Sequence, residues 1–233
     1  MEILNKASLP LGGFAGLKEH RLVTDSRVFG TAKPQNTYQG LGNFVYLADA
    51  FFNPKGETGM HPHREIDVIS VMIEGQISHQ GSLEHGKSLS AGDVQVQRAG
   101  GEGFSHNEIN PDETPDRMIQ LWVLPETKGQ PAGYKVYTPK HKGLSRIYGN
   151  QSADTPQSSE TFASDTLIDI LKLAPNESFE IDGSSLIYIT KGEAKAMESN
   201  EQKRVDNGDL IKANKLKLIA ETSIEAIVIS TDY

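Results

Sequence analysis

Short runs of β-favouring residues, separated by turn-forming residues, recur along this chain and constrain its fold more than any other feature. Turn signals such as Asn53-Pro54-Lys55-Gly56 and Asp206-Asn207-Gly208-Asp209 lie between the runs. Many short strands with such regular punctuation predict a sandwich or barrel of the jelly-roll kind. The predicted strands are Asn43–Leu47, Asp67–Ile73, Asp93–Gln97, Met118–Leu124, Thr166–Leu173, Ser185–Thr190, Leu210–Lys212, Leu216–Ala220 and Ile224–Ser230.

Two stretches of the second half lack a clear strand pattern. The segment Gln151–Glu160 is polar, rich in serine and contains Pro156, so we expect a loop there. A few helical turns are predicted around Pro139–Leu144.

The two halves of the chain echo each other. An apolar run ends at Gly75 in the first half and at Gly192 in the second, 117 residues later. The glycine of a following Gly-Asp turn recurs with nearly the same offset, because Gly208 follows Gly92 by 116 residues. We therefore predict two related β-domains, residues 1–140 and residues 141–233.

Composition excludes several classes of function. The formal net charge is −8, so the chain has no general attraction for nucleic acid or anionic lipid. It contains no cysteine, which excludes disulfides, thiolate metal sites and cysteine nucleophiles. The N-terminal segment does not have the pattern of a signal peptide, and no apolar run is long enough to cross a bilayer. We expect a soluble, cytoplasmic protein.

The first half contains two pairs of metal-capable side chains. His61 and His63 are two positions apart, and so are His106 and Glu108. Residues i and i+2 of a strand project from one face, so each pair can direct both groups at one point. In the second half, the equivalent positions fall near Ser178–Glu180 and near Thr222, and no histidine follows His141. We therefore expect only the first domain to bind a metal.

Three imidazoles and one carboxylate suit a first-row divalent transition metal. The carboxylate favours Fe(II), Mn(II) or Ni(II), and Cu or Zn is also compatible with the imidazoles. Four protein ligands leave about two positions open on an octahedral ion, where an organic ligand or O₂ can bind.

The other histidines and the aromatic residues near the motifs are assigned structural roles. His79 and His85 fall in the polar hairpin that follows Gly75, and we expect them to be exposed. Surface or structural roles are also expected for His20 and His141. Trp122 is expected in the core, as are Phe44 and Tyr46, whereas Gln120 is a polar candidate for lining a pocket.

The motifs resemble those of cupins and, more narrowly, those of the pirin family of bicupins. The resemblance is carried by His61-Pro62-His63-Arg64, Glu74-Gly75, Ala91-Gly92-Asp93, Gly103-Phe104-Ser105-His106-Asn107-Glu108, Ile119-Gln120-Leu121-Trp122-Val123 and Asp49. The chain departs from the pirin pattern twice. Asp67 stands where pirins have a glutamate, and we expect it to be structural or to support a ligand. The glycine stretch before His106 is one residue longer than usual, and a β-bulge is expected to absorb the additional residue.

The resemblance implies an all-β bicupin fold of two packed jelly-roll barrels. It also implies that His61, His63, His106 and Glu108 bind one metal ion, most often Fe(II). Bacterial pirins resemble quercetin 2,3-dioxygenases, so the implied activity is cleavage of a flavonol with O₂, with Glu108 as general base. Two alternatives stay open: an iron-dependent regulatory protein that acts through a protein partner, and a cupin enzyme with another small-molecule substrate. Neither membrane nor direct nucleic-acid binding is expected.

Overall fold

The computed structural model describes residues 1–83, 86–150 and 161–231, and these form two compact β-rich units. The N-terminal unit is Leu9–Thr138, and the C-terminal unit combines Met1–Ser8 with Pro139–Tyr233. The predicted division into residues 1–140 and 141–233 places the first eight residues differently. Strand β1 (Glu2–Asn5) pairs with β18 (Asp209–Ala220), which attaches the start of the chain to the C-terminal unit.

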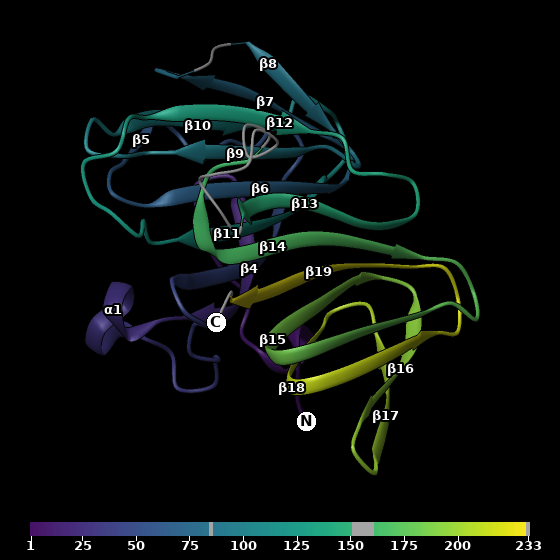
Figure 1. The fold of residues 1–233 in the computed structure, drawn as a ribbon. Coiled ribbons are helices and arrows are strands. Elements are labelled where there is room, and N and C mark those ends of the chain that lie inside the picture. The colour runs from purple at the N-terminus through teal and green to yellow at the C-terminus, as the bar shows by residue number, and fades with distance from the viewer. Residues whose placement is uncertain (84–85, 151–160, 232–233) are drawn as a thin grey trace. The chain divides into compact units, whose positions relative to one another are not determined.

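The N-terminal unit consists of a seven-stranded and a four-stranded antiparallel sheet in the described part of the chain (Figure 1). The larger sheet has the order β12-β9-β6-β11-β4-β3-β2, and the smaller has the order β5-β10-β7-β8. The bounds are β2 Gly12–Phe14, β3 Leu17–Thr24, α1 Ser26–Phe29, β4 Phe44–Phe52, β5 His61–His63, β6 Asp67–Glu74, β7 Gln76–Gly81, β8 Lys87–Ser90, β9 Val94–Arg98, β10 Phe104–Ile109, β11 Arg117–Val123 and β12 Gly133–Tyr137. Short 3₁₀ turns occur at Lys6–Ser8 and Gly30–Ala32.

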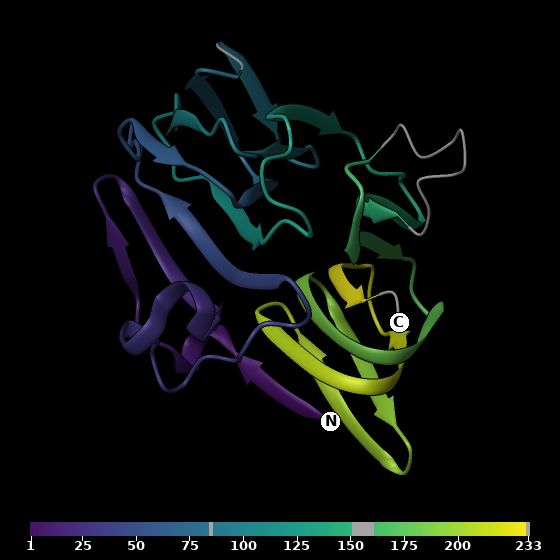
Figure 2. The ribbon, with the colours of Figure 1, turned by 60° about the vertical axis from the view of Figure 1, so that its left-hand side comes forward.

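The C-terminal unit is a single sheet with the order β13-β14-β19-β15-β18-β16-β17 and β1 paired to β18, as far as the described residues show. Its strands are β13 Gly143–Asn150, β14 Ser164–Leu173, β15 Ser178–Lys191, β16 Glu193–Glu198, β17 Glu201–Asp206, β18 Asp209–Ala220 and β19 Ile224–Thr231. Figure 2 shows the long strands of this unit, in green and yellow, as strongly bent ribbons. Alternate residues of these strands face one apolar core, which includes Ile187, Ile211 and Val228.

The order of the strands within the sheets explains the sequence similarity between the two halves of the chain. The order β4-β11-β6-β9 of the N-terminal unit recurs as β14-β19-β15-β18 in the C-terminal unit. Gly75 and Gly192 both have positive φ, of 74° and 80°, at the turn into the next hairpin, where a side chain would be strained. The fold is therefore an all-β bicupin, as predicted.

Strand pairing corrects the predicted counterparts of the metal motifs. Counted from the shared glycine, His79 corresponds to Ala196, and their partners across the ladder are Glu108 and Leu218. By the same register, His106 corresponds to Leu216 rather than to a residue near Thr222. Leu216 pairs with Ile181, as His106 pairs with His61, so the predicted position near Ser178–Glu180 is also shifted. The equivalent of the histidine site is therefore apolar.

Other local predictions were wrong or fall outside the described residues. The expected helical turns at Pro139–Leu144 are absent, because the chain there runs without helix into β13. Leu210–Lys212 and Leu216–Ala220 belong to one strand, β18, rather than two. The expected loop Gln151–Glu160 lies outside the described residues. No helix among the described residues is long and apolar enough to span a membrane.

Candidate metal centre

Two short strands of the smaller sheet bring the histidines together. Strand β5 is an edge strand, where Pro62 costs no ladder hydrogen bond on the open side. It pairs with β10 in a register that sets His61 opposite His106 and His63 opposite Phe104. Because alternate residues share a face, His61, His63 and His106 project to the same side of this ladder.

We predicted that a β-bulge absorbs the additional residue of the glycine stretch, but this stretch forms a turn before β10. The N–H of Gly103 donates to the Ala99 carbonyl over 2.9 Å, which closes the turn. Gly103 has a φ of 76°, and a Cβ there would lie 2.8 Å from the His63 carbonyl oxygen. Only glycine fits this turn without strain, and the β5–β10 register continues without a shift.

Three imidazole nitrogens converge at one point. The Nε2 atom of His106 lies 3.0 Å from Nε2 of His61 and 3.1 Å from Nε2 of His63. His61 Nδ1 lies 2.9 Å from the Gly59 carbonyl oxygen, which can only accept, so this nitrogen carries the proton. The Nε2 atom of His61 therefore presents a lone pair to the other two imidazoles.

These separations fit a metal ion. Two nitrogens that ligate one ion at about 2.1 Å lie about 3.0 Å apart when their bonds meet at a right angle, and about 3.4 Å apart at the tetrahedral angle. The two separations from His106 Nε2, 3.0 Å and 3.1 Å, are close to the value for a right angle. Among the described residues, these three histidines form the group whose ligand atoms can hold an ion.

Burial keeps two of the imidazoles neutral. Desolvation, with the neighbouring His61, lowers the pKa of His63 to about 4. Desolvation also lowers the pKa of His106 to about 2, with smaller contributions from His61, His63 and His79. Neutral imidazole is the form that binds a metal, so these residues need not lose a proton at neutral pH.

Glu108 lies on β10 but outside the histidine group. Its carboxylate accepts hydrogen bonds from Ser70 Oγ at 3.0 Å and from Gln120 Nε2 at 3.3 Å. Both partners belong to the larger sheet, where Ser70 on β6 lies opposite Gln120 on β11. Desolvation raises the pKa of Glu108 to about 7, against the lowering effect of the Ser70 hydrogen bond. The role of Glu108 as fourth ligand remains a prediction.

The prediction that His79 is exposed was wrong. Its side chain is fully buried, and its Nε2 atom lies 3.2 Å from Nδ1 of His106. The available signal was the spacing to Ile77, because an apolar residue two positions earlier on a strand indicates an inward face. His85 lies outside the described residues. His20 is partly buried with Nδ1 3.2 Å from the Leu9 carbonyl oxygen, and His141 is exposed, as a structural or surface role requires.

Asp67 and Asp49 form ion pairs. The Asp67 carboxylate is buried and lies 3.5 Å from Nε of Arg98, which fits the expected structural role. Asp49 is fully buried and receives two hydrogen bonds from Arg117, from Nε at 3.0 Å and from Nη2 at 2.6 Å.

An aromatic stack lies beside the histidines. Trp122 is partly buried, with its ring 4.2 Å from that of Tyr46 and 6.0 Å from that of His63. Phe29, from α1, stacks on both Tyr46 and Trp122. Phe44 and Tyr46 are buried, which confirms their expected place in the core. Trp122 is thus a wall next to the histidine group as well as a packing residue.

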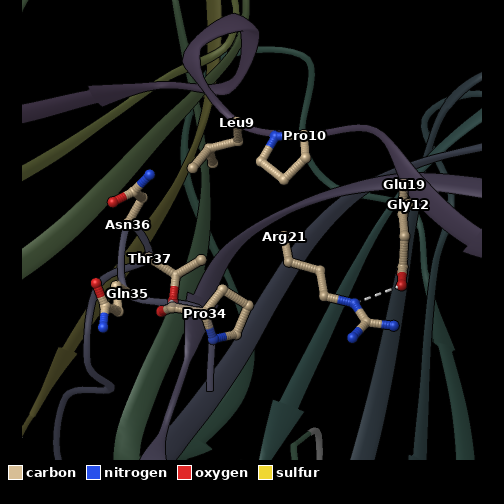
Figure 3. A pocket seen from close by; sticks show the side chains of 9 residues that line it. All are labelled: Leu9, Pro10, Gly12, Glu19, Arg21, Pro34, Gln35, Asn36 and Thr37. Atoms are coloured by element: carbon tan, nitrogen blue, oxygen red, sulfur yellow. Dashed lines mark hydrogen bonds and ion pairs between the residues drawn. The ribbon is translucent and has the colours of Figure 1, made fainter. Parts of the chain in front are cut away.

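A cavity of about 380 Å³ lies in the same unit (Figure 3). Figure 3 shows Arg21 and Glu19 side by side on β3, and Arg21 Nε donates to Glu19 Oε1 over 2.7 Å. The other Glu19 oxygen accepts a hydrogen bond from Tyr46 Oη at 2.7 Å. Glu19 thus links the cavity lining by a hydrogen bond to Tyr46, whose ring stacks on Trp122 beside His63. Its lining consists of Leu9, Pro10, Gly12, Glu19, Arg21, Pro34, Gln35, Asn36 and Thr37.

Known proteins share parts of this sequence and the architecture of the chain. A protein named quercetin 2,3-dioxygenase from Escherichia coli K12 is 35% identical over 72 residues, which cover 30% of this chain and 31% of that protein. Pirin-1 of Arabidopsis thaliana is 35% identical over 121 residues, covering 52% of this chain and 37% of the relative. The aligned segments thus span about a third of these relatives' length.

Solved structures extend the likeness to the whole fold. The crystal structure of the bacterial pirin YhhW from Escherichia coli, in complex with nickel(II), superposes with a TM-score of 0.81 at 19% identity, over 98% of this chain and 97% of that one. Fold and site together define a bicupin with a histidine cluster in its N-terminal unit. Residues 22–123 match the family model Pirin, and the described fold of the whole chain is similar to that of this bacterial pirin structure.

Proposed function

We propose that this chain is a metal-dependent dioxygenase that cleaves small aromatic substrates of the flavonol class. His61, His63 and His106 would hold one divalent ion, most often Fe(II), with Glu108 as fourth ligand or general base. Iron, Mn, Ni, Cu and Zn are all compatible with three imidazoles. When bound, the ion supplies a Lewis acid with open positions for a substrate oxygen and for O₂.

The convergence of the three Nε2 atoms carries this proposal. The lone pair of His61 Nε2 faces His106 Nε2 at 3.0 Å, and two facing lone pairs at this distance repel each other unless a cation or a proton lies between them. Burial keeps His63 and His106 neutral, so each of these rings carries one proton and has one nitrogen with a lone pair, the form of imidazole that ligates a metal ion. A metal ion satisfies all three nitrogens at once.

Glu108 is suited to move a proton. With a pKa raised to about 7, it exchanges a proton with little free energy at neutral pH, as a general base requires. Ser70 Oγ and Gln120 Nε2 donate to its two oxygens and hold the carboxylate in place. Glu108 would accept the hydroxyl proton of the flavonol, leaving an electron-rich oxygen to be bound. The overall reaction adds both atoms of O₂ to the flavonol and releases carbon monoxide from its central ring.

Aromatic side chains around the histidines support an aromatic substrate. Phe104 and Trp122 lie with ring centroids 5.2 Å and 6.0 Å from that of His63. The ring centroid of Phe14 lies 6.3 Å from that of His61, and this aromatic residue is 47% exposed to solvent. The relatives named quercetin 2,3-dioxygenase support the flavonol class.

The test is aerobic turnover of quercetin by untagged protein, stripped of metal and reloaded with Fe(II), Mn(II), Ni(II) or Cu(II) in turn. We expect loss of the flavonol absorbance and release of carbon monoxide with at least one ion. Glu108→Gln should reduce turnover by about 10²–10⁴-fold while the ion still binds, the range for a positioned general base. Exposed Glu113 offers the matched control, since Glu113→Gln makes the same change outside the site. Protein that binds the ion without consuming quercetin would refute the substrate class.

A further inference from the structure

A buried series of polar side chains leads away from the histidine group. Tyr134 Oη donates to Gln95 Oε1 over 2.9 Å, and Gln95 Nε2 donates to Gln97 Oε1 over 2.8 Å. The Nε2 atom of Gln97 lies 3.2 Å from Nε2 of His79, and that nitrogen lies 3.2 Å from Nδ1 of His106. Both glutamines and both histidines are fully buried.

This hydrogen-bond series has a direction, and the direction fixes the proton on His106. Gln97 Oε1 already accepts from Gln95, so the Gln97 amide presents its N–H to His79. A nitrogen that accepts from an amide N–H carries no proton of its own, so His79 Nε2 presents its single lone pair. A second lone pair on His106 Nδ1 at 3.2 Å would repel it, so His106 Nδ1 carries the proton and shares this acceptor with the Gln97 N–H. The remaining nitrogen of His106, Nε2, is then left with a lone pair, and this is the atom that faces His61 and His63.

We propose that Gln97 and His79 are positioning residues that hold His106 in the Nδ1–H tautomer and thereby prepare Nε2 to bind the metal. The proposal rests on the role of His106 as a ligand in the proposed function. His61 is held in the same tautomer by the Gly59 carbonyl oxygen. Imidazole ligands commonly have their second nitrogen fixed by a hydrogen bond of this kind.

The same side chains could also bond in the opposite direction. If both amides turned over, Gln97 Oε1 would face His79, and His79 Nε2 would carry a proton and donate it. His106 Nδ1 would then accept, its proton would move to Nε2, and that nitrogen would no longer be available to an ion. The series therefore has one polarity that permits metal binding and one that opposes it.

The location of the glutamines argues for a role beyond packing. Gln95 and Gln97 alternate with the buried Val94 and Val96 in the interior of the larger sheet. Burying an amide costs free energy where its hydrogen bonds are not made. Two apolar residues at these positions would not carry this desolvation cost. Each glutamine makes one hydrogen bond through its amide oxygen and one through its amide nitrogen, in series between the Tyr134 phenol and the two histidines.

Two substitutions at one position separate polarity from packing. Gln97→Glu keeps the shape of the side chain and, once its carboxyl group is ionised, presents only acceptor oxygens to His79, which imposes the opposite polarity. Gln97→Met keeps a similar volume and imposes neither. Gln95→Glu reverses the polarity without changing the residue next to His79. A carboxylate at position 95 accepts a hydrogen bond from the Gln97 N–H, so the Gln97 amide turns over and its Oε1 faces His79.

The experiment has two readouts. Long-range ¹H–¹⁵N correlation spectra of the metal-free protein at neutral pH report which nitrogen of His106 is protonated. Competition between the protein and a chelator for Ni²⁺ reports the affinity of the protein for this ion. We expect Nδ1–H in the unaltered protein and Nε2–H in Gln97→Glu and Gln95→Glu. Ni²⁺ affinity should fall by about 10–100-fold in both, as for loss of a partner that orients a ligand, and should fall less in Gln97→Met.

The outcomes distinguish this proposal from the proposed function. An Nε2–H tautomer of His106 in the unaltered protein, or an unchanged tautomer and unchanged Ni²⁺ affinity in Gln97→Glu, would overturn the positioning role. A correct Nδ1–H tautomer in a protein that binds no Ni²⁺ would leave the tautomer assignment standing and refute the metal site. If Gln97→Glu does not fold, Gln95→Glu, which changes a residue one step further from His79, gives the same test.

Discussion

Replacing Glu108 with glutamine should make the metal-free N-terminal unit more stable at alkaline pH. Glu108 is fully buried, and burial raises its pKa from 4.5 to about 7. A raised carboxyl pKa means that the folded state binds the proton more tightly than the unfolded state does. Its contribution to stability is therefore complete below about pH 4.5 and is lost as the pH rises through about 7.

The size of the effect follows from the shift. A change from 4.5 to about 7, at 1.36 kcal/mol per pKa unit, corresponds to roughly 3 kcal/mol of unfolding free energy. Glutamine resembles the protonated acid and never ionises, so Glu108→Gln avoids this loss. The variant should equal the unaltered protein near pH 4 and exceed it by about 3 kcal/mol at pH 8.

Urea unfolding followed by tryptophan fluorescence provides the assay. Trp122 is the only tryptophan of the chain and lies on β11, so its emission reports on the N-terminal unit. Burial also raises the pKa of Asp116, to about 6. The unfolding free energy of both proteins should therefore fall with rising pH because of Asp116, and the fall should be smaller in Glu108→Gln, which lacks the contribution of Glu108. Equal stabilities of the two proteins at pH 8 would refute the raised pKa of Glu108.

Three further predictions concern the same unit. Asp49→Ala should lower the unfolding free energy by about 3–5 kcal/mol, because it leaves the charge of Arg117 buried without a partner. The control variant, Glu113→Ala at the surface, should change the urea midpoint little. Equal midpoints of the two variants would contradict this prediction. His63→Ala should weaken binding of Ni²⁺ in a chelator competition, and unchanged affinity would exclude His63 as a ligand. Ni²⁺ should quench Trp122 fluorescence in the unaltered protein, because this ring lies 6.0 Å from that of His63; binding without quenching would place the ion elsewhere.

The sequence predicted the strands where apolar alternation and turn residues agree. Asp67–Ile73 lies within β6 almost residue for residue, and Gly75 and Gly192 marked equivalent turns in the two units. Strands such as β7 and β8 were missed, since they carry polar residues on both sides of Ile77 and of Leu89. Their places depend on partners far away in the chain, which local pattern does not encode.

The candidate site was predictable to the extent that it follows strand alternation. The spacing of His61 and His63, and of His106 and Glu108, is enough to place each pair on one face of a strand. What spacing does not give is the environment on the opposite sheet. The hydrogen bonds of Glu108 to Ser70, and of His79 to His106, arise between strands that the fold brings together, and neither pair is close in the sequence.

Strand register also explains why the predicted counterparts of the metal-site residues in the C-terminal unit were wrong. An offset of a few residues between the two halves placed the counterpart of His106 near Thr222, at a turn, instead of at Leu216 within β18. Only the ladder partners fix such a register, because a strand can slide along a repetitive pattern without changing it. The equivalent of the histidine site is thus part of an apolar core rather than a polar loop.

The measurement that tests the central claim most directly is equilibrium dialysis of untagged, metal-free protein against Ni²⁺ at pH 7.5. One ion per chain should bind in the unaltered protein, and the protein in which His61, His63 and His106 are all replaced by alanine should bind none. Equal binding by the two proteins would contradict the assignment of these three imidazoles as the metal centre.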